Sequence, residues 1–285
     1  MTARALGALV LLALATMPVV LAPSARGVEN QPASPANRSL PEAATLFDQH
    51  VQAIGGIDAV RRHASLKFTG TIKIPAMKYT AFTTIWQVAP ASFAMYTEPP
   101  GGQRGEVYCD GTHAWEKMPL PDGSIRAVLY TDSRWTDTVY SASFYGDADP
   151  ASRYSKIQTV ELTDFNGSPA YKVFAEATVG KQLFLFFDQK SGLIVGSHTV
   201  QSEGGQTIPV IMIYDAYREV DGVKYITGVT QRTPGGDVII SYRAIEANPS
   251  DVPLIELPAE LRAQATQLGA TPPDPEPDAP SSDQD

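Results

Sequence analysis

The sequence predicts a mainly β (α+β) fold, an antiparallel half-open β-barrel of about ten or eleven strands with capping helices. Two observations lead to this prediction. From residue 64 onward apolar and polar side chains alternate, and short turn motifs separate the alternating segments. Because such short turns join neighbouring strands, successive strands must run antiparallel. A twisted sheet of this size curls, and helices are expected to cover the side that it leaves open.

The chain is expected to begin with a secretory signal peptide, residues 1–26. Arg4 supplies the positive start, Leu6 to Leu21 is largely apolar, and small residues follow. An uncleaved membrane anchor is the alternative, although the apolar run is short for a span. We therefore expect a protein exported to the periplasm.

The rest of the chain divides into three parts. Residues 27–38 are predicted to be a flexible linker, residues 39–268 the folded domain, and residues 269–285 a disordered tail. The tail is rich in proline and acidic residues and contains no basic residue. The net charge of -9 argues against nucleic acid as a partner.

The domain is predicted to open with a helix. Ser39 and Glu42 have the spacing of a capping box. Helical spacing then places four apolar side chains on one face: Leu46, Phe47, Val51 and Ile54. Gly55-Gly56 would end this helix, and a shorter one is expected over Ile57–His63.

The alternating segments that follow are predicted strands. They are Leu66–Ile74, Tyr79–Val88, a short stretch with Phe93 and Met95, Glu106–Cys109, His113–Lys117, Ile125–Tyr130, Ile157–Leu162, Ala170–Ala177, Gln182–Phe187, Leu193–Val200, Thr207–Glu219, Val223–Arg232 and Val238–Glu246. Asp110-Gly111, Asn166-Gly167 and Asp221-Gly222 are predicted two-residue hairpin turns in which both residues have positive φ. One helix, over Asp132–Tyr145, interrupts the pattern, and another short helix is expected after the last strand, over Pro258–Gln267.

Motifs for catalysis or metal binding are absent from the sequence. There is no HExxH, CxxC or GxSxG pattern, so we predict no enzyme, no cofactor and no metal. Asp147 and Asp149 have a spacing that would suit Ca²⁺ or acid–base work, but a solvated loop is the favoured interpretation. Cys109, the single cysteine, is expected to be buried and inert, and Asp110 with His113 near it is better explained by a turn than by a nucleophile site.

Two strands are apolar on both faces, Phe184 to Phe187 and Val210 to Ile213. Continuous apolar runs belong to strands that are covered on both sides. One interpretation is an ordinary packed core. The other is that part of this surface lines a cavity for an acyl chain or a similar ligand.

Several segments resemble the LolA/LolB-like lipoprotein-sorting superfamily of exported bacterial proteins. They are His50–Gly56, Ser65–Thr71, Phe187–Leu193, Tyr214–Val223, Ala247–Pro249 and Leu257–Ala259. The resemblance implies a half-open antiparallel barrel whose helices cap the open side and whose interior receives lipid moieties in the periplasm. The chain departs from the carriers of that family in its greater length and its acidic tail.

These considerations predict a monomeric periplasmic carrier or binding protein that shields a lipid, a lipoprotein acyl chain or another apolar ligand. Five aromatic side chains are expected to border the ligand: Phe82, Trp86, Phe93, Phe184 and Phe186. One alternative is an envelope interaction protein with a packed barrel, which would bind its protein partner through an exposed aromatic patch of Trp135, Tyr140, Phe144 and Tyr145. A small-molecule enzyme that uses the same cavity is a further alternative.

Overall fold

The computed structural model describes residues 39–120, 122–203 and 206–268. The predicted signal peptide, linker and acidic tail lie outside the described residues. No helix within the described part of the chain is long and apolar enough to cross a membrane.

All strands belong to one antiparallel sheet of thirteen strands, in agreement with the predicted half-open barrel. The strands are β1 (Ser65–Ile74), β2 (Tyr79–Val88), β3 (Ser92–Glu98), β4 (Gly105–Cys109), β5 (Ala114–Pro119), β6 (Ile125–Leu129), β7 (Tyr154–Phe165), β8 (Ser168–Ala177), β9 (Gln182–Asp188), β10 (Ile194–Glu203), β11 (Gln206–Val220), β12 (Val223–Thr233) and β13 (Gly236–Ala247). The predicted count of ten or eleven was slightly low, because all thirteen alternating segments, including the short ones, form strands of this sheet.

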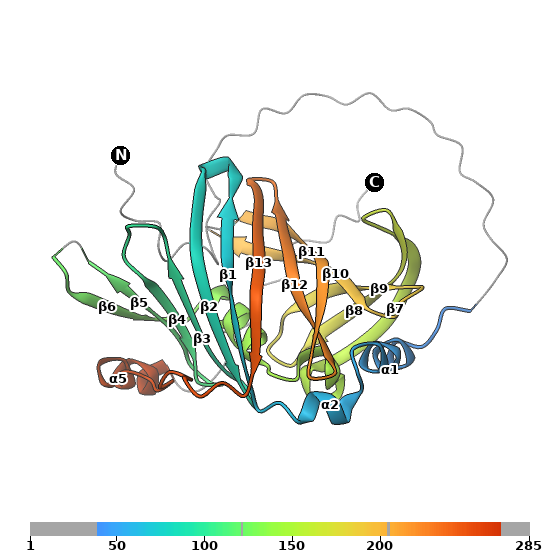
Figure 1. Ribbon diagram of the computed structural model, residues 1–285, viewed down its shortest axis with the longest axis horizontal. Helices are drawn as coiled ribbons and strands as arrows, with labels where there is room; N and C mark the ends of the chain where they lie inside the picture. Colours follow the sequence, from blue (N-terminus) through green and yellow to red (C-terminus); the bar gives the residue numbers. More distant parts are fainter. Residues whose placement is uncertain (1–38, 121, 204–205, 269–285) are drawn as a thin grey trace.

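The sheet consists of two meanders that join at its centre. Strands β1 to β6 follow one another in one direction, β13 back to β7 follow in the other, and β1 pairs with β13. Strands β6 and β7 therefore lie at opposite edges and do not pair, so the sheet stays open (Figure 1). Register shifts in four strand pairs, for example beside Gly70 and Gly196, allow the strands to bend.

The helices lie at the ends and on the faces of this sheet. They are α1 (Ala43–Ala53), α2 (Ile57–Arg61), α3 (Ser133–Ala142), α4 (Pro150–Arg153) and α5 (Ala259–Leu268), with single 3₁₀ turns η1 (Pro75–Met77) and η2 (Gly146–Ala148). All four predicted helices are therefore present. The predicted capping box is wrong, because α1 begins only after Glu42, whose side chain makes no cap hydrogen bond. The carbonyl of Pro41 instead accepts a hydrogen bond of 2.7 Å from the hydroxyl of Thr159 on β7, which holds the preceding segment against the sheet.

The predicted hairpin turns are present at two of the three sites. Asn166-Gly167 and Asp221-Gly222 have positive φ at both residues, as expected. At Asp110-Gly111 only the glycine has positive φ. The Asp110 carboxylate accepts hydrogen bonds from the backbone N–H groups of Thr112 and His113, which stabilises a longer loop there.

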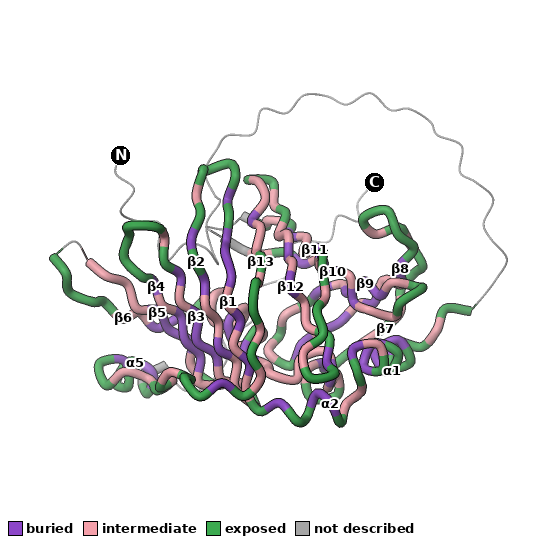
Figure 2. Tube along the Cα trace, in the orientation of Figure 1, coloured by how far each residue is buried: buried purple, intermediate pink, exposed green. Residues whose placement is uncertain are grey.

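Apolar clusters lie on both faces of the sheet. One face of β2 to β6 packs against α5 through Trp86, Trp115 and Leu261. The opposite face packs against α3 and, across the molecule, against α1. Figure 2 shows the buried residues of β2 to β5 concentrated toward the ends of the strands near α5. The face that contacts α1 and α3 is called the inner face below, and the face that contacts α5 is the outer face.

Candidate ligand-binding face

The segment between β6 and β7 connects the two opposite edges of the sheet, and its contacts show that it crosses the inner face. It contains α3, η2 and α4. The apolar side of α3 packs on the β3–β5 half, where Trp135, Val139 and Ala142 contact a cluster that includes Phe93 and Met95. Near the end of α3, Tyr140 packs against the cluster of the β7–β10 half. The helix is therefore a bridge over the inner face that is tethered at both ends.

Polar contacts anchor α3 to the β5–β6 side. The guanidinium of Arg134 lies 3.7 Å from the carboxylate of Glu116, which is 5 % exposed on the inner face of β5. The hydroxyl of Tyr130 donates to the same carboxylate over 3.1 Å. Burial raises the pKa of Glu116, and the contacts with Tyr130 and Arg134 oppose this shift only in part.

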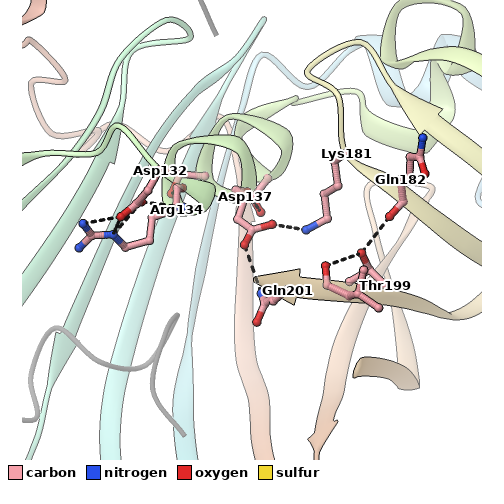
Figure 3. A network of polar contacts seen from close by, with 10 residues as sticks. Asp132, Arg134, Asp137, Lys181, Gln182, Thr199 and Gln201 are labelled. Carbon is pink, nitrogen blue, oxygen red and sulfur yellow. Dashed lines mark hydrogen bonds and ion pairs between the residues drawn. The ribbon is translucent and has the colours of Figure 1, made fainter. Parts of the chain in front are cut away.

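A second set of contacts anchors α3 to the other half of the sheet. The ammonium of Lys181, next to β9, forms an ion pair with the carboxylate of Asp137. The side-chain amide of Gln201 on β10 donates to the other oxygen of that carboxylate over 3.2 Å. Figure 3 shows Asp137 between these two partners, with Arg134 and the N-cap residue Asp132 at the start of the same helix. Both side chains of the ion pair are 14 % exposed, so the pair is largely removed from water.

A third polar group lies where the crossing segment meets α1. The hydroxyl of Tyr154 donates to Asp147 over 2.5 Å, and the hydroxyls of Tyr140 and Tyr154 are 3.0 Å apart. The guanidinium of Arg153 stacks over the ring of Tyr140 at 3.9 Å and lies 3.5 Å from Asp147. Burial, together with the neighbouring Asp147 carboxylate, raises the pKa of Tyr154, so this tyrosine donates its proton to a hydrogen bond rather than losing it. Asp147 therefore differs in part from the expected solvated loop, because its side chain is 24 % exposed but also accepts a hydrogen bond from Tyr154.

The inner face between these anchors keeps apolar side chains that are only partly covered. Cross-strand pairing places them in one surface: Ile85 on β2, Ile208 and Met212 on β11, and Ile240 on β13. Each is half-buried although it points toward the inside of the curve. An apolar surface of this kind, with a few polar groups around it, is suited to an apolar ligand.

The five aromatic residues that the sequence singled out lie on two faces. Phe93 is on the inner face, in the cluster beneath α3. The other four are on the outer face, where Trp86 packs near α5, Phe82 is 58 % exposed, Phe184 contacts Phe174 and Phe186 stacks on Phe165. The five side chains therefore do not converge, and contact of any of them with a ligand remains a prediction. The alternation in the sequence divides the side chains of each strand into two sets, one for each face. It does not indicate which set lies on the inner face.

The aromatic residues around α3 do not form the exposed patch that the alternative required. Trp135 packs into the β3–β5 cluster and donates its indole N–H to the carbonyl of Thr112 over 2.8 Å. Tyr140 and Tyr145 pack against the clusters near α1. Phe144 is half-buried and stacks edge-on against Tyr145. Their role is to fix the crossing segment to the inner face.

Other residues with reactive or titratable side chains have structural roles. Cys109 is fully buried, and burial raises the pKa of its thiol to about 12. The Nδ1 atom of His50 accepts a hydrogen bond of 3.2 Å from the backbone of Ile194, and burial lowers its pKa. Over residues 39–120, 122–203 and 206–268, no three or more His, Cys, Asp or Glu side chains lie together in a way that would hold a metal ion.

Comparison with known proteins shows which fold this chain has. No protein-family model and no curated protein sequence matches the chain. Three solved structures are similar over most of its length. A DUF1329 family protein from Desulfovibrio piger has a TM-score of 0.51 and 11 % identity over 73 % of this chain and 94 % of its own. A LolA superfamily protein from Nitrosomonas europaea has a TM-score of 0.51 and 11 % identity, over 78 % and 97 %.

The third structure is a domain from Vibrio parahaemolyticus described as an outer membrane lipoprotein-sorting protein. It has a TM-score of 0.50 and 9 % identity over 79 % of this chain and 97 % of its own. At these identities the similarity concerns the fold, and the fold is LolA-like, as the sequence resemblance implied.

Proposed function

From the LolA-like fold and its partly covered inner face, we propose that this chain is an envelope carrier that binds a lipid or lipoprotein acyl chain without chemical change. The single observation that carries the proposal is the position of α3. Apart from α1, which packs on the β7–β10 half, a single tethered helix of the described chain crosses an open sheet whose inner face is apolar on both halves. An acyl chain placed beside it would be removed from water at a gain of about 0.8 kcal/mol for each CH₂.

The proposed location is the periplasm, and the proposed state is a monomer with no cofactor. The predicted signal peptide supports export. The solved neighbours support an envelope role in so far as one of them is described as an outer membrane lipoprotein-sorting domain. The polar groups of the inner face support binding rather than catalysis, because each carboxylate is already paired: Glu116 with Arg134, Asp137 with Lys181 and Asp147 with Tyr154.

The test is native mass spectrometry of the mature protein purified gently from its own envelope, followed by organic extraction. We expect a reproducible extra mass that extracts as lipid. A clean apo mass, combined with no uptake of added lipid, would overturn the carrier proposal.

The edge strand β7 favours a second candidate function, binding of an envelope protein. Val160 and Leu162 on this strand are 43 % and 46 % exposed, and the strand has a neighbour on one side only. An exposed edge with apolar side chains can accept an additional strand from a partner. If this is its function, Leu162→Lys should abolish co-purification of an envelope protein and leave any bound lipid in place.

A further inference from the structure

Two hydroxyl groups lie buried on the inner face without a hydrogen-bond partner. Thr83 on β2 and Thr97 on β3 are each 2 % exposed, and neither Oγ1 atom has a partner among the described residues. They are direct cross-strand partners, so their side chains are neighbours on the same face. A buried hydroxyl that makes no hydrogen bond costs about 1–3 kcal/mol, so two adjacent ones are costly unless a ligand satisfies them.

Their position on the inner face follows from the strand alternation. Ile85 lies two residues after Thr83, and Met95 lies two residues before Thr97. Both apolar residues belong to the cluster beneath α3. Because side chains two residues apart share a face, the hydroxyl pair lies on the inner face, next to that cluster.

The register across four strands places this pair in a low row of the sheet. Gly70 on β1 is the partner of Thr83, and Gly105 on β4 is the partner of Thr97. Neither glycine has a side chain to fill the row, and at Gly70 a Cβ atom would meet the carbonyl oxygen of Ser241 at 2.1 Å. Over β1 to β4 the row therefore carries no side chain larger than threonine, and Tyr242 on β13, the other partner of Gly70, closes it at that end.

Apolar rows lie on both sides of this row. One contains Ile85, Met95 and Val107, and the other contains Ile72 and Ala81. Since the two hydroxyls are covered in this structure, an acyl chain that joins the two apolar rows would take the place of what now covers them. A ligand made of hydrocarbon alone would leave them unsatisfied, whereas the carbonyl oxygen of an acyl ester accepts hydrogen bonds from both.

We propose that Thr83 and Thr97 form a two-hydroxyl anchor that donates hydrogen bonds to the ester carbonyl of a bound acyl lipid. The anchor rests on the proposed carrier function and specifies its ligand, an ester-linked rather than an ether-linked lipid. It also fixes the position of the lipid, with the ester at the glycine–threonine row and the chain against the apolar residues.

The test compares two phospholipids with the same headgroup and chain length, one a diacyl ester and the other its dialkyl ether analogue. Binding is measured by displacement of a fluorescent acyl probe from the full chain. We expect the ester lipid to bind the unaltered protein about tenfold more tightly, since each hydrogen bond contributes about 0.5–1.5 kcal/mol. Thr83→Val and Thr97→Val should each remove about half of this preference on a logarithmic scale, and the double variant should bind both lipids equally.

Thr80→Val is the matched control, because Thr80 lies on the same strand but is exposed on the outer face. It should keep the preference for the ester. The valine variants should unfold at the same or a higher temperature than the unaltered protein, since they remove an unsatisfied buried hydroxyl. Equal binding of ester and ether lipids by the unaltered protein would overturn the anchor alone, and so would a preference that survives in the double variant. Failure of both lipids to bind would overturn the carrier proposal together with the anchor.

Discussion

Asp137 on α3 and Lys181, the residue before β9, form an ion pair that links the crossing segment to the far half of the sheet. The chain approaches α3 from β6, at the opposite edge. The pair is therefore a tertiary contact between parts of the fold that the strand ladder does not connect directly. Since Gln201 also donates to Asp137, removal of one partner leaves a carboxylate that is still largely buried.

Lys181→Met should lower the free energy of unfolding by about 2 kcal/mol, because it leaves Asp137 without its cation. The measurement is urea unfolding followed by circular dichroism. The matched control is Lys172→Met, whose ion pair with Glu161 on β7 is more exposed and should contribute less than about 1 kcal/mol. Equal losses in the two variants would contradict a structural role for the Asp137 pair.

Glu116 predicts a pH dependence of stability. Burial raises its pKa in the folded protein above the ordinary value of 4.5. Between that value and the raised pKa the folded state binds more protons than the unfolded state, so this group's contribution to stability falls as the pH rises. The stability of the unaltered protein relative to Glu116→Gln should therefore increase when the pH is lowered from neutral toward 4.5. The measurement is urea unfolding of both proteins at several pH values. A stability difference that does not change with pH would show that the pKa of Glu116 is not raised in the folded protein.

Inner and outer faces are distinguished by placing a charge on each. Met212→Glu puts a carboxylate on the inner face, where its desolvation should weaken uptake of a fluorescent palmitoyl probe by at least about tenfold. Phe184→Glu puts the same charge on the outer face, beside Lys172, and should leave uptake unchanged. Loss of uptake only in the Phe184 variant would move the site to the outer face, where most of the aromatic residues predicted from the sequence lie.

The turn after α1 depends on a close approach between two glycines. A Cβ atom on Gly55 would meet the carbonyl oxygen of Gly222 at 2.0 Å, and Gly55 has a φ of 123°. Gly55→Ala should therefore destabilise the protein by about 3 kcal/mol or more, through both strain and displacement of the β11–β12 turn. Gly56→Ala is the control, since Gly56 also has positive φ but has open space around its Cβ position, and should cost about 1 kcal/mol. The two losses are compared by thermal unfolding, and similar values would contradict the steric argument.

The strands were predictable from sequence because alternation is a local property. Phe82 and Trp86 were correctly placed on a common face of one strand, and Asn166-Gly167 correctly placed a turn. The inner face was not predictable, since no local signal tells which set of alternating residues meets α3. The pairing of Thr83 with Thr97 depends on the register between β2 and β3, and the partnership of Asp137 with Lys181 depends on strand order across the sheet.

Tertiary contacts also decided the start of α1. The spacing of Ser39 and Glu42 favoured a capping box, yet the hydrogen bond from Thr159 to the carbonyl of Pro41 holds this stretch against β7. The local preference of the sequence was real, but a contact more than a hundred residues away determined the backbone conformation.

The pairing of the first strand with the last has a consequence for how the chain acquires its structure. The side chain of Asn248 accepts a hydrogen bond from the backbone N–H of Ala64, 184 residues away in the sequence, at the end of the β1–β13 ladder. In a chain that is synthesised from its N-terminus, β1 to β6 can assemble early. The second edge of β1, however, stays unpaired until β13 has been synthesised. Until then β1 is a long unpaired template on which another chain could add a strand. The slow step of folding is thus expected to be the pairing of β1 with β13, which brings together the two ends of the domain.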